Sequence, residues 1–261
     1  MNTFKVTNGN DSGNGSLRSA IALANASPGK DDILVEVDVE LNSAINITDS
    51  VTIGNPFGAT ITQIGSDRIF NIDDNNDDLD LDISLYRLNL QGGYSESVGG
   101  AISSQENLSI IDSQLVNNTA ISGAAVYLEN AALYIERTQI KSNQITDITT
   151  PSNEDNLQVV NGQLQIANSI LEPANIITEA LPGLDSPGFL ARDTSANFLA
   201  GGSGDDIILG VDGLNTLVEA DDNDKIDSGA GNDTLVTSWI LVGMSTIILA
   251  IKIYRLLNLS A

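Results

Sequence analysis

Aliphatic residues recur along the chain in a pattern that predicts short, stacked strands. Each repeat has three aliphatic positions, the first two of them two residues apart, and the four sets are Ile83, Leu85 and Leu90; Leu108, Ile110 and Leu115; Leu133, Ile135 and Ile140; Leu164, Ile166 and Leu171. The first three sets are 25 residues apart and the fourth follows after 31. A single coil cannot bury its inner face, so the period predicts a stack of coils. We expect an all-β right-handed parallel β-helix over residues 1–180.

A short amphipathic helix is expected near the start, over about residues 16–27. Ser16 can cap the first turn, and residues 28–29, Pro-Gly, end the helix. Its apolar residues share one face: Leu17, Ala20, Ile21 and Ala24. We expect this helix, with Arg18, to cap the open end of the strand stack and to prevent edge-to-edge association.

Three other segments have patterns of their own. In residues 35–41, valine and leucine alternate with acids, which predicts one half-buried strand. Asp78, Asp80 and Asp82 have the spacing of an EF-hand loop, but Ile83 and Asn89 stand where that loop needs glycine and glutamate. We therefore favour a strand with a solvated acidic face there, with loose surface calcium as the alternative. Residues 144–163 are expected to form a long loop.

Beyond residue 190 the period shortens to nine. Four copies start at Gly201, Gly210, Glu219 and Ser228, and a weaker copy starts at Arg192. The eighth position is aliphatic throughout, as Leu199, Ile208, Leu217, Ile226 and Leu235. Residues 192–236 are therefore expected to form a second module of short strands separated by turns, joined to the first by a proline-glycine segment.

The turns of this module offer ligands for a hard cation. Glycine lets backbone carbonyls approach an ion, and a sixth-position carboxylate adds a charged oxygen, which suits calcium. The candidate calcium-binding residues are Gly201, Gly202, Gly204, Asp206, Asn215, Asp224, Gly229, Gly231 and Asp233. The neutral Asn215 and the third copy, which lacks glycine, predict one or two weakly held ions. A degenerate solenoid that no longer binds metal is the alternative.

Residues 201–209 match the nonapeptide G-G-x-G-x-D-x-U-x at every constrained position, U being a large aliphatic residue. The module thus resembles the calcium-binding β-roll of RTX (repeats-in-toxin, hemolysin-type) proteins. The resemblance implies that each ion lies between neighbouring turns on one edge. The first and third copies would share one site, and the second and fourth another.

The first module resembles two further families of secreted bacterial β-helix proteins. Residues 99–102 (Gly-Gly-Ala-Ile) and 115–118 (Leu-Val-Asn-Asn) resemble the G-G-A-I and F-x-x-N motifs of polymorphic outer-membrane protein repeats, with Leu115 replacing the aromatic residue. Residues 15–25 resemble the Cys-Ser-Leu-Arg-Glu-Ala type of N-terminal domain, with Gly15 and Ser19 replacing its cysteine and glutamate.

The charge of the chain and the residue types that it lacks exclude some binding partners and some kinds of catalysis. Acids outnumber bases 35 to 11, which gives a net charge of −24, and the chain has no histidine and no cysteine. Such a charge disfavours nucleic acid and anionic lipid, and it repels acidic polysaccharide unless calcium bridges the two. Disulfides and thiol catalysis are excluded, and a zinc site is improbable.

The last segment, residues 237–261, has no acidic residue, and its apolar, uncharged run from Trp239 to Ile251, 13 residues, is shorter than the roughly 20 that a membrane-spanning helix needs. Three interpretations stay open: closing strands with a C-terminal secretion signal, a membrane anchor, or the product of a shifted reading frame. Residues 1–12 have neither the basic region nor the apolar core of a cleavable signal. The RTX resemblance implies type I secretion instead.

The sequence thus predicts a non-enzymatic, calcium-binding protein that is extracellular or on the cell surface. It would act as an adhesin or coat component, with cell-surface or matrix polysaccharide as a candidate partner. The alternative is a polysaccharide lyase or epimerase, because some alginate epimerases join a β-helix to RTX repeats. Their active-site pattern includes histidine, which this chain lacks, and no motif surrounds Arg68, Arg87 or Arg137. Arginines and carboxylates clustered in one groove would favour the enzyme.

Overall fold

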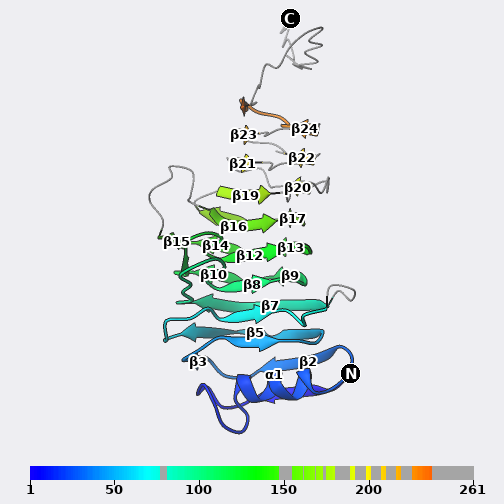
Figure 1. The fold of residues 1–261 in the computed structure, drawn as a ribbon, viewed down its shortest axis with the longest axis vertical. Coiled ribbons are helices and arrows are strands. Elements are labelled where there is room, and N and C mark those ends of the chain that lie inside the picture. The colour runs from blue at the N-terminus through cyan, green and yellow to red at the C-terminus, as the bar shows by residue number, and fades with distance from the viewer. Residues whose placement is uncertain are drawn as a thin grey trace, which may run out of the picture.

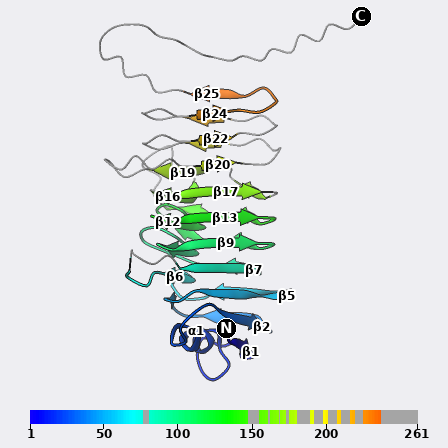
Figure 2. The same cartoon turned by 90° about the vertical axis from the view of Figure 1, so that its right-hand side faces the viewer.

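The computed structural model describes residues 1–76, 81–146, 155–160, 162–167, 169–172, 175–179, 189–191, 198–200, 207–209, 216–218 and 225–236. Over these ranges the chain is all-β, with α1 (Leu17–Asn25) as its single helix. All strand pairings in the described residues are parallel, and the strands stack along one long axis (Figures 1 and 2).

Two large sheets contain most of the strands. The 11-stranded sheet is formed by β1 (Thr3–Val6), β2 (Asp31–Val35), β3 (Val39–Leu41), β5 (Val51–Gln63), β7 (Asp82–Gln91), β9 (Asn107–Ile111), β10 (Gln114–Val116), β13 (Ala132–Glu136), β14 (Gln139–Lys141), β17 (Gln163–Ala167) and β18 (Ile170–Glu172). The nine-stranded sheet is formed by β4 (Ile45–Ile47), β6 (Phe70–Ile72), β8 (Ile102–Ser104), β12 (Val126–Glu129), β16 (Asp155–Val160), β19 (Asn175–Glu179), β21 (Phe198–Ala200), β23 (Thr216–Val218) and β25 (Thr234–Val236).

Two smaller sheets complete the described strands. One pairs β11 (Thr119–Ala120) with β15 (Gln144–Ile145), and the other is formed by β20 (Phe189–Ala191), β22 (Ile207–Leu209) and β24 (Lys225–Asp227). The chain passes repeatedly between the large sheets, so that each strand pairs with the equivalent strand one circuit earlier.

The sequence repeat appears as strand register. Leu108 pairs with Ile83 and with Leu133, and Leu133 pairs with Leu164. The third position of the repeat behaves in the same way, because Leu115 pairs with Leu90 and Ile140. These side chains are buried in one continuous core. The spacings of 25 and 31 residues therefore measure one circuit of the chain, as the pattern predicted.

Helix α1 covers one end of the stack, where it contacts β1, β2 and β4 (Figure 1). Ser16 caps it by accepting a hydrogen bond from the Ser19 amide at 3.2 Å. The four residues predicted to share its apolar face are the ones it buries: Leu17, Ala20, Ile21 and Ala24. Arg18 donates to Asp11 Oδ1 at 2.6 Å and to the carbonyl oxygens of Ser43 and Ala44, which confirms it as part of this cap.

Two sequence predictions were wrong in detail. Residues 35–41 are not one strand, because the chain turns at residues 36–38 between β2 and β3, where Asp38 Oδ1 accepts from the Thr60 amide at 2.7 Å. Residues 155–160 are strand β16 and not loop, because Leu157 and Val159 are buried where β16 pairs with β12. The first prediction failed because alternation of apolar and polar residues does not show where a strand ends. The second failed because Leu157 and Val159 stand among polar residues, which are typical of a loop.

Buried asparagines form a second kind of column inside the stack. Asn118 accepts from the Gly93 amide at 2.8 Å and donates to Leu90 O at 3.2 Å and to Asn143 Oδ1 at 3.0 Å. Asn143 in turn donates to Leu115 O at 3.1 Å. Each of these side chains thus forms hydrogen bonds with backbone groups at a corner, where no strand pairing provides them.

We predict that Asn118→Ala destabilises the protein, because it leaves a buried amide and a buried carbonyl unpaired, each worth about 1–3 kcal/mol. Urea unfolding followed by circular dichroism measures the change. Asn46→Ala removes an exposed asparagine from β4 and should alter the free energy of unfolding by less than about 0.5 kcal/mol. Equal effects of the two substitutions would contradict this account.

Candidate functional site

The strands of the nine-residue repeat stack two copies apart. Ile208 of the first copy pairs with Ile226 of the third, while Leu217 of the second pairs with Leu235 of the fourth. The weaker copy follows the same rule, since Leu199 pairs with Leu217. Successive copies therefore alternate between two sheets, and one circuit takes 18 residues in place of 25.

Of the candidate calcium-binding residues, the structure describes only those of the fourth copy. Gly201, Gly202, Gly204, Asp206, Asn215 and Asp224 lie outside the described residues. Gly229 and Gly231 have φ angles of 75° and 143°, which side chains disfavour, and the Gly229 amide donates to Asp227 Oδ1 at 3.1 Å. The partly exposed Asp233 stands directly before β25. This turn thus needs glycine at positions 229 and 231, because its backbone conformation there is one that other residues rarely adopt.

A second group of carboxylates lies at a corner of the stack. One oxygen from each of Asp73, Asp74 and Glu106 lies within 4.8 Å of the others, so the three can hold a cation. Glu106 is only 4% exposed and accepts from the Leu81 amide at 2.8 Å and the Asp74 amide at 3.4 Å. Burial raises the pKa of the Glu106 carboxyl above its usual range, an effect that these amides oppose.

The sequence had drawn attention to the acids of this segment but not to Glu106. Exposed Asp82 separates buried Leu81 and Ile83, in agreement with the alternation expected there. Asp78 and Asp80 lie outside the described residues. Glu106 belongs to the next circuit of the chain, and a lone acid between polar neighbours gives no sign in the sequence that it will be buried.

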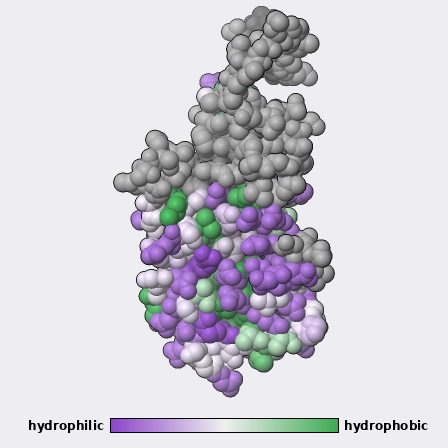
Figure 3. All heavy atoms as spheres, in the orientation of Figure 1, coloured by the Kyte–Doolittle hydropathy of each residue, from purple (hydrophilic) through white to green (hydrophobic). Residues whose placement is uncertain are grey.

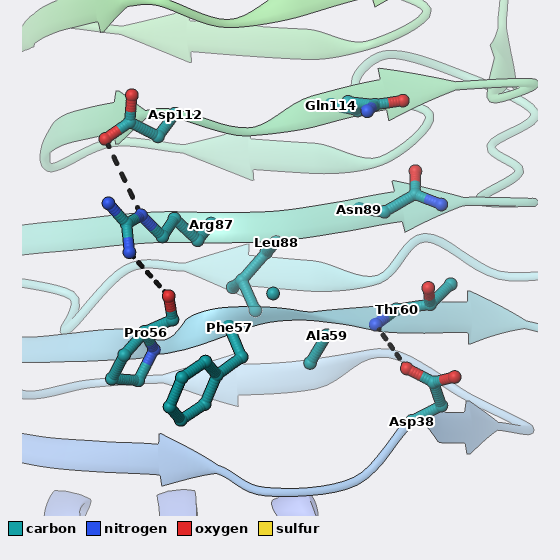
Figure 4. A pocket seen from close by; sticks show the side chains of 11 residues that line it. Asp38, Pro56, Phe57, Ala59, Thr60, Arg87, Leu88, Asn89, Asp112 and Gln114 are labelled. Carbon is teal, nitrogen blue, oxygen red and sulfur yellow. Dashed lines mark hydrogen bonds and ion pairs between the residues drawn. The ribbon is translucent and has the colours of Figure 1, made fainter.

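The exposed side of the 11-stranded sheet contains an open groove of about 630 Å³ (Figure 4). Its lining residues come from four successive levels of the stack: Asp38, Pro56, Phe57, Gly58, Ala59, Thr60, Arg87, Leu88, Asn89, Asp112 and Gln114. In Figure 4, Arg87 extends between Pro56 and Asp112 along one side, and Thr60, Asn89 and Gln114 follow one another along the other. The groove is therefore polar, with one aromatic ring beside it.

Two of the three arginines considered from the sequence meet one carboxylate. Arg87, Asp112 and Arg137 occupy equivalent corners in three circuits, all with positive φ angles of 50°, 51° and 47°. Arg137 Nε donates to Asp112 Oδ1 at 2.6 Å, and Arg87 Nε lies 3.9 Å from Asp112 Oδ2. The hydrogen bond lowers the pKa of Asp112 and raises that of Arg137.

Arg68 lies elsewhere, in a half-buried corner where it donates to Asn71, Ser95 and the Val98 carbonyl oxygen. Burial lowers the pKa of its guanidinium. The sequence did not reveal the cluster of Arg87, Asp112 and Arg137, because its middle member is an acid and the other two are bases. Their common spacing of 25 residues, which equals the repeat, is the signal that could have revealed it.

Comparison with known protein families, with curated proteins and with solved structures found no match. The described part of the surface is mainly hydrophilic on the face seen in Figure 3, with small hydrophobic areas between. Among the described residues, no helix is long and apolar enough to cross a membrane. The tail at residues 237–261 lies outside them.

We predict that Glu106→Gln changes the pH dependence of stability. A raised folded-state pKa means that protonated Glu106 contributes stability below its unfolded-state pKa, and this contribution is lost as the pH rises through the folded-state pKa. In chelator, wild type should therefore gain stability relative to the variant as the pH falls from about 7 to about 4.5. Parallel curves of unfolding free energy against pH would show that Glu106 is not responsible.

Proposed function

We propose that this chain is a calcium-binding β-solenoid of the RTX type, secreted or held at the cell surface, and that it acts without catalysis as an adhesin or coat component. In this proposal the circuits of the larger part are coils of a right-handed parallel β-helix with a capping helix. The nine-residue repeats continue the stack as a short β-roll.

The 18-residue strand register is the observation that carries the proposal. Asp206 immediately precedes β22 and Asp224 immediately precedes β24, and these two strands pair through Ile207 and Lys225. Asn215 and Asp233 have the same relation to β23 and β25. Because paired strands are about 4.8 Å apart, each sixth-position side chain would have its partner one level away. Two sites at opposite edges would result.

The glycine conformations of the fourth copy support the same proposal. Positive φ angles at Gly229 and Gly231, four and two residues before Asp233, turn the chain, so backbone carbonyls and a carboxylate could face one ion. A turn with acids and no cation would repel its neighbours in a chain of charge −24. Calcium would remove that repulsion, and its binding free energy would become folding free energy.

A polysaccharide lyase or epimerase remains the second candidate. The observation in its favour is that Arg87 and Asp112 line one groove, with Arg137 bonded to Asp112. A lyase needs a free, neutral guanidinium as its base, however, and the Arg137 guanidinium is hydrogen-bonded to the Asp112 carboxylate. The arrangement therefore favours binding over catalysis.

We predict that calcium, titrated from the chelated state to millimolar concentrations, increases the β-sheet circular dichroism signal. The double variant Asp206→Ala with Asp233→Ala should raise the midpoint calcium concentration at least about tenfold, because it removes one carboxylate from each proposed site.

Asp32→Ala with Glu96→Ala is the matched control, since it removes two negative charges far from the repeats and should leave the midpoint unchanged. A protein that is fully β-structured in chelator and indifferent to calcium would refute the proposal. Its nonapeptides would then be structural relics.

A further inference from the structure

We propose that the groove beside Phe57 binds a segment of uncharged polysaccharide, and that it does so without using the calcium sites. The groove belongs to the lower circuits of the stack, between β3 and β10, whereas the nine-residue repeats lie at its other end (Figure 1). The proposal is therefore independent of the function proposed above.

Phe57 is displayed by a bulge in strand β5 that holds its side chain outside the fold. Strand β5 has extra residues between Gly54 and Ala59, where β7 passes the same corner with fewer. Phe57 lies within this insertion and is 97% exposed. Buried Asn55 fixes the bulge, because its side chain donates to the Val35 carbonyl oxygen and accepts from the Phe57 amide at 2.8 Å.

Arg87 supports the same bulge from the next circuit by donating to the Pro56 carbonyl oxygen. A large aromatic side chain in water gives up the stabilisation that burial would provide. Three hydrogen bonds, two from the Asn55 side chain and one from Arg87, hold the bulge in place, so its exposed ring is suited to stacking on the apolar face of a ligand. The C–H face of a sugar ring provides such a surface.

The floor of the groove supplies matching polar groups in a line. Thr60 pairs in register with Asn89, and Asn89 with Gln114, so a hydroxyl and two amides follow one another along the stack. Amides and hydroxyls both donate and accept hydrogen bonds, as sugar hydroxyls do. Asn89 Oδ1 is buried and has no hydrogen-bond partner among the described residues, so no bond to this oxygen locks the amide in place.

The charges of the groove favour an uncharged chain. Asp112 is balanced by Arg87 and Arg137, and Asp38 is an exposed acid at the other side. A polyanion would meet Asp38 and the overall charge of −24. A polycation would have to compete with two arginines for Asp112. A neutral polysaccharide avoids both penalties while using the amides and the ring.

The test is calorimetric titration of the full chain, in calcium, with neutral hexasaccharides: cellohexaose, xylohexaose and mannohexaose. At least one should bind, and Phe57→Ala should weaken its binding about tenfold or more through loss of stacking. Asn89→Ala should weaken it as well, by removing the centre of the polar floor. Ile64→Ala is the matched control, because Ile64 is 56% exposed and does not line the groove.

Phe57→Ala removes no buried contact, so its circular dichroism spectrum and calcium response should equal those of wild type. The proposal is overturned if no neutral hexasaccharide binds, if Phe57→Ala binds as wild type does, or if hexagalacturonate or an acidic peptide binds more tightly. Absence of saccharide binding with a normal calcium response would refute this proposal alone. Saccharide binding by a protein that ignores calcium would refute only the proposed calcium sites.

Discussion

The rest of the structure depends on the hydrogen-bonded pairing of each parallel strand with its equivalent one circuit away. This ladder decides which residues lie above one another, so inner aliphatic residues repeat and polar residues at one corner form columns. Leu108 and Leu133 illustrate the first consequence, and Asn118 and Asn143 the second. The candidate sites obey the same rule, since the groove and the proposed calcium turns each draw equivalent residues from successive levels.

The repeats allowed much of the fold to be predicted, because a period in the sequence becomes a register in space. The helix also followed from local pattern, from its Ser16 cap to its buried Ala24. Features that break the period could not be predicted in this way. The Phe57 bulge is an insertion in β5, and buried Glu106 accepts hydrogen bonds from amides of the previous circuit, at Asp74 and Leu81. Asp112 is an acid, whereas the residues at the same corner of the neighbouring circuits, Arg87 and Arg137, are bases. A comparison of residue types therefore did not place the three together.

The two repeat lengths share one ladder. Strand β16 of the longer repeat pairs with β19, β19 pairs with β21, and β21 begins the strands of the nine-residue repeat. A circuit of 18 residues can stack on one of 25 or 31 because the spacing between paired strands is the same for all of them. What changes is the sequence between the strands: corners with buried asparagine in one part, and short segments rich in glycine and acidic residues in the other.

Hydrogen exchange of backbone amides, read segment by segment in calcium and in chelator, tests the central claim most directly, namely that calcium orders the short-repeat end of this ladder. The account predicts that amides of β22 to β25 are protected in calcium and exchange rapidly in chelator, while those of β7, β9 and β13 change much less. Equal protection of β22 to β25 in both conditions would contradict it, because the stack would then hold its short repeats without calcium.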